Sequence, residues 1–231
     1  RFRELIPFTE EGTRIISLSE GNTPLVGARR TGWWAGPVHL TVKHQGNNPT
    51  GSFKDLGMTA CITRADSRRI RVVACASTGN TSSSMAAYAA RAGIKALLFV
   101  PKRQISEAKL AQALDFGATV IEVGDTFDQA FSLMRELAAE MGIYLVNSVN
   151  PFRIEGQKTA SFEVVDTLGD APDLLFIPVG NAGNITAYWK GFREYQDLGR
   201  SQTLPRMMGF QAEGAAPIVR GEPVANPQTI A

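Results

Sequence analysis

The chain has 231 residues, 44% hydrophobic and 20% charged, so it can bury a substantial core in one large domain or two modest ones. Its 24 basic and 22 acidic residues give a formal net charge of +2, so no general field favours nucleic acid as a partner. No apolar run approaches the ~20 residues that span a bilayer, and the N-terminal residues lack a signal-peptide pattern, so we expect a cytoplasmic protein without a membrane partner.

Strand-like apolar runs alternate with helical stretches along the chain. The expected strands are 38–43, 70–76, 96–100, 119–123, 144–147 and 174–179. The expected helices are 55–64, 81–91, 107–116, 127–141, 155–168 and 185–195. Glycines at positions 93, 117 and 142 follow three of these helices, where a helix commonly ends. This alternation predicts an α/β fold in which helices flank mostly parallel sheets.

Lys54 lies where a strand and turn give way to a helix, in the run Pro49-Thr50-Gly51-Ser52-Phe53-Lys54-Asp55. A charged lysine in the first turn of a helix opposes the helix dipole at a cost of about 0.3–1 kcal/mol, and a neutral imine avoids part of this cost. A Lys-Asp pair by itself is more typical of a solvent-exposed helix start. Two later segments change this interpretation.

Both later segments have the same order of strand, small-residue turn and helix. The sequence Ser77-Thr78-Gly79-Asn80-Thr81-Ser82 follows the apolar run 72–76, and Gly180-Asn181-Ala182-Gly183-Asn184 follows 174–179. A glycine-rich turn that opens a helix gathers backbone N–H groups at the positive end of the helix dipole, which favours anions. The second turn therefore indicates a phosphate site, although it lacks the Gly-Lys-Ser/Thr and G-x-G-x-x-G patterns, and an ordinary tight turn is the alternative.

The cysteines and histidines form no recognisable metal or redox motif. Cys61 and Cys75 are 14 positions apart without C-x-x-C spacing, and we expect both to be buried thiols in a reducing compartment. His39 and His44 lack clustered Cys, Asp or Glu neighbours. We therefore expect no metal site.

Together, the three turn segments resemble the pyridoxal-phosphate enzymes of the tryptophan-synthase-β fold type, fold type II, and the detailed pattern is similar to the threonine synthase family within it. The resemblance runs from Glu20-Gly21-Asn22-Thr23-Pro24-Leu25 to Gly221-Glu222-Pro223-Val224. Its most specific parts are 74–81, 145–150, 153–159 and 180–187. The resemblance implies a larger cofactor-binding domain of residues 1–68 and 148–231 and a smaller mobile domain of residues 69–147.

The resemblance also implies roles for individual residues. Lys54 is implied as the catalytic residue that carries pyridoxal 5'-phosphate as an imine and then moves protons, and Asn80 as the partner of the cofactor's phenolic oxygen. The loop implied to bind the cofactor phosphate is Gly180, Asn181, Ala182, Gly183 and Asn184. The implied substrate, O-phospho-L-homoserine, carries a second phosphate, and the positions for that pocket are Ser77, Thr81, Lys109, Asn147, Ser148 and Arg153.

The implied reaction is a lyase-type β,γ-replacement in threonine biosynthesis, in which O-phospho-L-homoserine and water give L-threonine and phosphate. Two departures stand out: Leu56 occupies the place of a family arginine, and the family continues well beyond Ala231, so we expect an incomplete C-terminal part. One alternative is a serine/threonine dehydratase or cysteine synthase, which needs no substrate-phosphate pocket. Another is a non-catalytic relative that binds a phosphorylated ligand. The resemblance is compatible with a homodimer.

Overall fold

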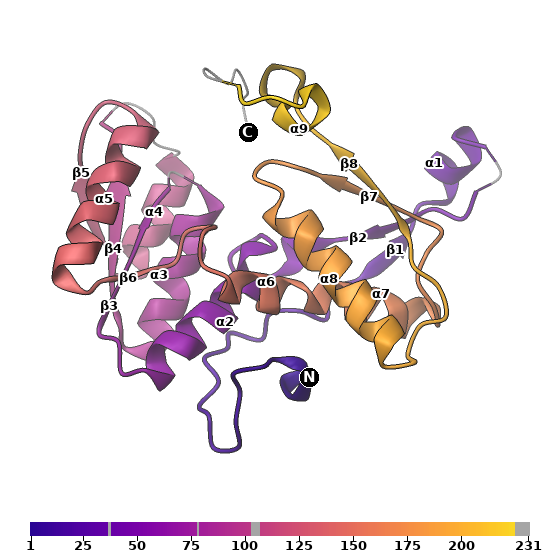
Figure 1. Ribbon diagram of the computed structural model, residues 1–231, viewed down its shortest axis with the longest axis horizontal. Coiled ribbons are helices and arrows are strands. Elements are labelled where there is room, and N and C mark those ends of the chain that lie inside the picture. The colour runs from indigo at the N-terminus through magenta and orange to yellow at the C-terminus, as the bar shows by residue number, and fades with distance from the viewer. Residues whose placement is uncertain (37, 78, 103–106, 225–231) are drawn as a thin grey trace. The chain divides into compact units, whose positions relative to one another are not determined.

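The chain folds into two compact units, Arg1–Thr159 and Ala160–Ala231, in the computed structural model (Figure 1). The structure describes residues 1–36, 38–77, 79–102 and 107–224. Each unit has its own parallel strands, connected by helices. The predicted division into domains 1–68 with 148–231 and 69–147 stays a prediction.

The first unit contains a four-stranded sheet in the order β5-β4-β3-β6, in which every neighbouring pair is parallel. Its strands are β3 (Val72–Ala76), β4 (Lys95–Val100), β5 (Thr119–Glu122) and β6 (Tyr144–Leu145). The helices that connect them are α3 (Asn80–Ala92), α4 (Glu107–Asp115) and α5 (Phe127–Met141). Parallel strands joined through helices confirm the predicted α/β class.

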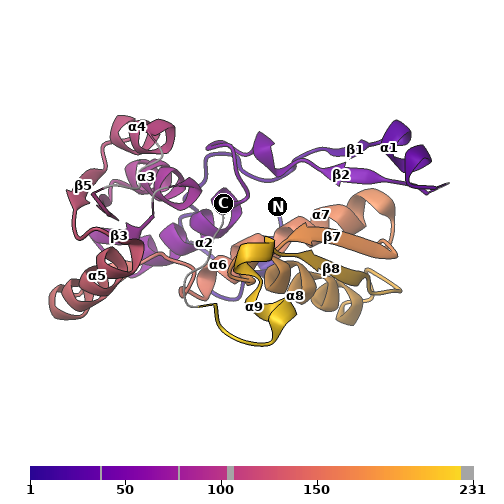
Figure 2. The same cartoon turned by 90° about the horizontal axis from the view of Figure 1, so that it is seen from above.

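Alternate residues of β3 contribute to two different cores. Val73 and Cys75 belong to the core that includes buried residues of α3 and α4, whereas Ala74 and Ala76 belong to a smaller core with Met134 of α5. Successive side chains of a strand point to opposite faces, and both faces of a parallel sheet are normally covered. Figure 2 shows α3 and α4 on one side of these strands and α5 on the other.

The ends of the helices follow the local sequence. Thr126 and Gln129 form a capping box at the start of α5, in which the backbone N–H of each residue donates to the side-chain oxygen of the other at 3.3 Å. The three glycines after α3, α4 and α5 have positive φ angles of 73° at Gly93, 79° at Gly117 and 66° at Gly142. Glycine adopts this left-handed conformation at little cost, which confirms the helix ends predicted at these positions.

Close packing between α2 (Lys54–Ser67) and α6 (Phe152–Gln157) brings Arg153 beside the first turns of α2. A Cβ atom added to Gly57 would lie 2.7 Å from Nε2 of Gln157 and 3.2 Å from the carbonyl oxygen of Arg153. A larger residue at this contact would push the helices apart.

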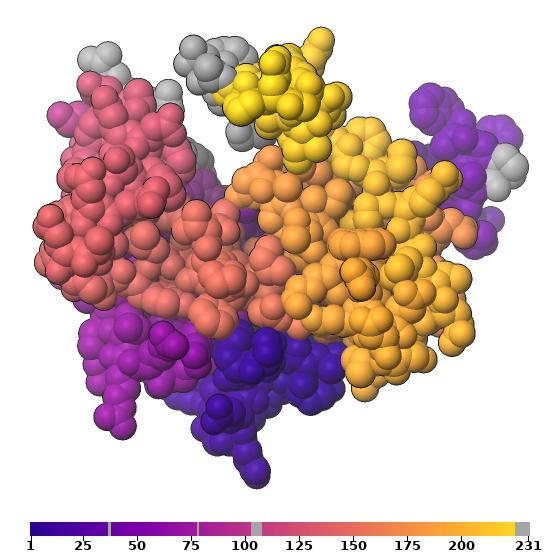
Figure 3. All heavy atoms as spheres, viewed as in Figure 1, coloured from indigo at the N-terminus to yellow at the C-terminus, as the bar shows by residue number. Residues whose placement is uncertain are grey.

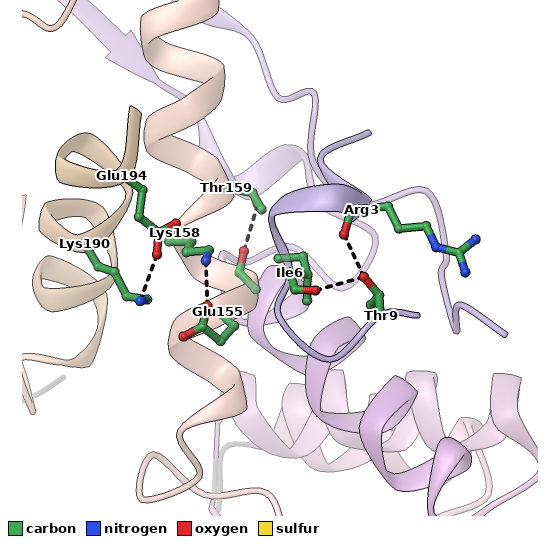
Figure 4. A network of polar contacts seen from close by, with 9 residues as sticks. Arg3, Ile6, Thr9, Glu155, Lys158, Thr159, Lys190 and Glu194 are labelled. Atoms are coloured by element: carbon green, nitrogen blue, oxygen red, sulfur yellow. Dashed lines mark hydrogen bonds and ion pairs between the residues drawn. The ribbon is translucent and has the colours of Figure 1, made fainter. Parts of the chain in front are cut away.

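The expected helix at 155–168 is two helices, α6 and α7 (Thr159–Leu168), so the prediction of one continuous helix is wrong. Thr159 donates from Oγ1 to the carbonyl oxygen of Gly156 at 2.8 Å, a local bond that competes with regular helix hydrogen bonding. Lys158, between the helices, is buried and pairs with Glu155 at 2.6 Å (Figure 4).

β1 (Leu25–Gly27) and β2 (Thr41–Lys43) form an antiparallel pair within the first unit, apart from its parallel sheet. The strand expected at 38–43 is therefore only three residues long. Between β1 and β2 lies α1 (Arg29–Trp34), which exposes Trp33 and Trp34. Single 3-10 turns occur at Arg3–Leu5 and Gln45–Asn47.

The second unit is built from β7 (Leu174–Pro178), α8 (Gly183–Asp197) and the parallel strand β8 (Arg206–Phe210). The sequence did not predict β8. Phe162 of α7 stacks on Tyr195 of α8, with ring centroids 4.1 Å apart and planes inclined by 8°. This aromatic pair forms part of the buried interior of the unit.

The surface of the second unit includes an ion pair and a short apolar helix. Lys190 and Glu194 of α8 pair at 2.8 Å (Figure 4). After a 3-10 turn at Glu213–Ala215, α9 (Pro217–Arg220) lies at the surface (Figure 3). Its side chains Ile218 and Val219 are exposed. None of the helices in the described part of the chain has the length and apolar character needed to span a bilayer.

Candidate active site

Lys54 begins α2, and its side chain is half-buried. Its Nζ lies 4.3 Å from the centroid of the Phe53 ring. Burial and, second, the positive charge of Arg153 lower the pKa of Lys54 to about 8. A lysine with this pKa is partly neutral near physiological pH, and the neutral amine is the nucleophilic form.

The turn before Lys54 is held by the carboxylate of Asp55, which is fully buried. Thr50 donates to this carboxylate from its backbone N–H at 2.7 Å and from Oγ1 at 2.6 Å, and Ser84 of α3 donates from Oγ at 2.6 Å. Burial raises the pKa of Asp55, while the bonds from Ser84 and Thr50 act in the opposite direction. Gly51 completes the turn with a φ of 82°, where glycine is favoured.

Ser77, Asn80 and Thr81 lie between the end of β3 and the first turn of α3, as expected. The backbone N–H of Gly79 donates to Oγ of Ser77 at 3.2 Å, which tightens the turn. Asn80 is exposed at the start of the helix, Thr81 is buried, and Thr78 lies outside the described residues. This is the carboxyl end of a parallel strand, the end where open α/β sheets bind ligands.

Asn147 connects the segment after β6 to the end of β3. Its Nδ2 donates to the carbonyl oxygen of Ala76 at 2.8 Å, and its Oδ1 accepts from the N–H of Ala76 at 3.1 Å. These bonds use one of the two hydrogens on Nδ2, so the other can reach a ligand. Ser148 follows with an exposed side chain.

Arg153 is a buried cation, with 2% of its surface exposed. Its Nη1 makes two long hydrogen bonds of 3.4 Å, to the carbonyl oxygen of Val146 and to Oγ of Ser148. Its Nε has no partner, and within the described ranges no carboxylate pairs with it. Burial lowers the pKa of Arg153. A desolvated guanidinium with unfilled donors favours an anion that can bind two of its N–H groups.

Lys109 reaches from α4 to the turn before Lys54. Its Nζ donates to the carbonyl oxygen of Thr50 at 3.1 Å and to Oε1 of Gln112 at 3.3 Å. A residue predicted to bind the substrate is thus held against the segment that carries the predicted catalytic lysine.

Residues 180–184 lie in the second unit after β7, and Gly183 and Asn184 are the first two residues of α8. Ala182 precedes the helix with φ 62° and ψ −2°, an uncommon left-handed conformation for alanine. Asn181 accepts from the N–H of Gly183 at 3.1 Å, and Oδ1 of Asn184 is buried without a partner in the described part of the chain. The first N–H groups of α8 have no partner within the helix, so they suit an anion.

Cys61 and Cys75 are buried free thiols, as predicted. Burial raises the pKa of each to about 12, which leaves the thiols unreactive at neutral pH. Among the residues that the structure describes, no cluster of three or more His, Cys, Asp or Glu side chains could hold a metal ion.

A family model described as pyridoxal-phosphate dependent enzyme matches residues 16–231. The chain belongs to the pyridoxal-phosphate dependent enzyme family. Its cofactor is therefore pyridoxal phosphate, which confirms that prediction.

Threonine synthases are among the curated relatives of this family member. The chain is 52% identical over 231 residues to the threonine synthase of Synechocystis sp. and 55% identical over 232 residues to that of Mycobacterium tuberculosis, with 100% of the chain covered in both cases. It spans 60% and 64% of the lengths of these two relatives. The sequence-based resemblance to threonine synthase is thereby confirmed.

The fold is similar to that of threonine deaminase isoform 2 from Solanum lycopersicum, with a TM-score of 0.77 and 26% identity, covering 90% of this chain and 57% of that one. This similarity confirms the predicted fold type of the pyridoxal-phosphate dependent enzyme.

The residues present fit pyridoxal phosphate. Lys54 offers a half-buried amine of lowered pKa for the cofactor's aldehyde. After Gly183, whose own N–H donates to Asn181, the next residues of the first turn of α8 offer backbone N–H groups to a phosphate, and Gly183 has no side chain to block them.

The sequence did not reveal the roles of Asp55, Thr50 and Ser84. Asp55 and Thr50 lie in the same run, 49–55, as Lys54, but nothing local distinguishes a buried acceptor from an acidic residue at a solvent-exposed helix start. The partner that decides the matter, Ser84, is 29 residues away.

Proposed function

We propose that the protein is a threonine synthase, which converts O-phospho-L-homoserine and water to L-threonine and phosphate. The observation that carries the proposal is Arg153, a buried guanidinium with an unpartnered Nε whose charge also lowers the pKa of Lys54. A substrate with a phosphate group would supply the anion that this cation needs.

Arg153 belongs to a group of donors suited to the substrate phosphate. Ser148 lies within 3.4 Å of its Nη1, and Asn147 precedes Ser148 with one Nδ2 hydrogen unused by Ala76. Ser77, Thr81 and Lys109 complete the proposed set. Binding the phosphate here would orient the substrate and hold the leaving group in a desolvated, positively charged environment.

Lys54 would hold the cofactor covalently and then act as the base and acid that moves protons at Cα and Cβ of the substrate. Its pKa of about 8 suits both roles, because a group that titrates near the working pH can both accept and release a proton. When bound, pyridoxal phosphate supplies an electron sink for the charge left at Cα. Asn80 would donate to the ring's phenolic oxygen, and residues 180–184 would bind the cofactor phosphate.

The test is an assay of the purified protein with pyridoxal phosphate and O-phospho-L-homoserine. L-Threonine and phosphate should appear in equal amounts, and L-serine or L-threonine alone should release little ammonia. Ammonia release without phosphate release would identify a dehydratase instead. Arg153→Lys is the matched variant, because lysine keeps a charge but cannot form the forked pair of bonds to phosphate.

A further inference from the structure

The carboxylate of Asp55 joins three segments that carry predicted site residues. It belongs to α2, directly after Lys54, and accepts bonds from Thr50 in the preceding turn and from Ser84 in α3. Thr50 in turn accepts at its carbonyl oxygen from Nζ of Lys109 in α4. A continuous chain of hydrogen bonds thus runs from α3 through α2 and the turn to α4.

The positions of these partners relate them to the proposed site. Ser84 follows Asn80 by four residues, so the two lie one turn apart on the same side of α3. Two of the bonds to Asp55 come from Thr50 alone, which fixes both its backbone and its side chain. The same turn therefore sets the backbone position from which the Lys54 side chain extends. It also provides the carbonyl oxygen that Lys109 contacts.

A stabilising charge at the start of a helix does not explain this arrangement. An acidic residue in the first turn interacts favourably with the helix dipole while exposed to water. Asp55 is fully buried instead, and the desolvation of a carboxylate is offset only when its oxygens receive well-placed donors. Here the three donors come from two separate elements, so all of them must be in place together.

We propose that Asp55 is a positioning residue, which holds the Lys54 turn and the N-terminal part of α3 in the arrangement needed to bind pyridoxal phosphate and, through Thr50, keeps Lys109 beside them. The inference rests on the proposed function. Asp55 does not touch the reacting atoms; it acts through Thr50 and Ser84.

The same helix provides a matched control. Tyr88 lies one turn beyond Ser84 and donates to Oε2 of Glu20 at 2.7 Å. Tyr88→Phe therefore removes one hydrogen bond of α3 in which neither Asp55 nor Thr50 takes part. Thr50→Val removes the hydroxyl that donates to Asp55 with little change in side-chain volume, whereas Thr50→Ser keeps a hydroxyl at this position.

The experiment measures the fraction of Lys54 that becomes covalently linked to pyridoxal phosphate after borohydride reduction, as a function of cofactor concentration, by mass spectrometry of the lysine peptide. We expect Asp55→Asn and Thr50→Val to need about tenfold more cofactor, the effect of one lost bond to a buried charge. Thr50→Ser should return to within about twofold of the parent protein, and Tyr88→Phe should match the parent.

Equal cofactor requirement in Thr50→Val and the parent protein would overturn the proposal, and so would an equal loss in Tyr88→Phe, which would indicate a general effect of stability. Asp55→Asn can also impair folding, so the Thr50 pair decides the matter, with thermal unfolding of each variant recorded alongside. Failure of the parent protein to link cofactor at Lys54 would instead contradict the proposed function.

Discussion

Gly156 of α6 lies so close to Leu56 of α2 that a Cβ atom on the glycine would be 1.8 Å from the carbonyl oxygen of Leu56. Backbone atoms occupy both sides of this contact, so no side-chain rotation can relieve the overlap. Lys54 and Arg153 are carried by these same two helices. The contact therefore affects both the stability of the first unit and the geometry of the proposed site.

Gly156→Ala should destabilise the protein by about 1–3 kcal/mol, because the added methyl group forces α6 away from α2. Urea unfolding measures this change. The control is Gly27→Ala, since a Cβ at Gly27 meets no atom within 4 Å. A variant Gly156→Ala as stable as the parent protein would show that the two helices can separate without cost.

Lys54→Ala should abolish the visible absorbance of the protein-bound cofactor, because the substitution removes the amine that binds it covalently. The fold should remain, since Lys54 is only half-buried. Absorbance spectra with pyridoxal phosphate and circular dichroism of both proteins provide the measurement. An unchanged spectrum in the variant would place the attachment at another lysine.

The rate of cofactor attachment should rise with pH and level off above about pH 8, because only the neutral amine of Lys54 reacts and its pKa is lowered to about 8. Arg153→Ala should move this plateau to higher pH, since the positive charge of Arg153 is one of the two causes of the lowered pKa. Rates of absorbance change across pH 6–10 test both statements. A pH profile identical in the two proteins would mean that burial alone sets the pKa.

Arg153→Ala should also reduce kcat/KM for O-phospho-L-homoserine. The reduction should correspond to about 1.5–3 kcal/mol of lost transition-state stabilisation, the range for a hydrogen bond to a charged group. Cofactor affinity at high pH should change little, because the proposed cofactor-phosphate loop lies elsewhere in the chain. Arg153→Lys should recover part of the loss. If cofactor affinity fell and substrate kinetics did not, Arg153 would serve the cofactor or the scaffold.

Gly183→Val should weaken cofactor retention, whereas Gly183→Ala should have a smaller effect. A Cβ at Gly183 would lie 3.2 Å from Oδ1 of Asn181, which accepts from the N–H of Gly183, and a branched side chain crowds this first turn further. Equilibrium dialysis against pyridoxal phosphate measures the retention. Equal affinity in all three proteins would exclude this loop as the phosphate site.

The short-range pattern of the sequence determined the alternation of strands and helices, and with it the parallel α/β class. Strand β3, for example, is buried on both faces, and its continuous apolar run predicts this without knowledge of its neighbours. The glycines that end α3, α4 and α5 were equally predictable from local sequence, because the ease of adopting a positive φ depends on the residue itself. The resemblance in the three turns also indicated Lys54 and its cofactor.

Only the tertiary structure decided how the site is held together. Asn147 bonds to Ala76 across 71 positions, Lys109 to Thr50 across 59, and Ser84 to Asp55 across 29. The tertiary structure also added β8 beside β7. A side chain's propensity says whether it can donate or accept, but which partner it meets depends on the packing of helices against the sheet, which no local pattern of residues specifies.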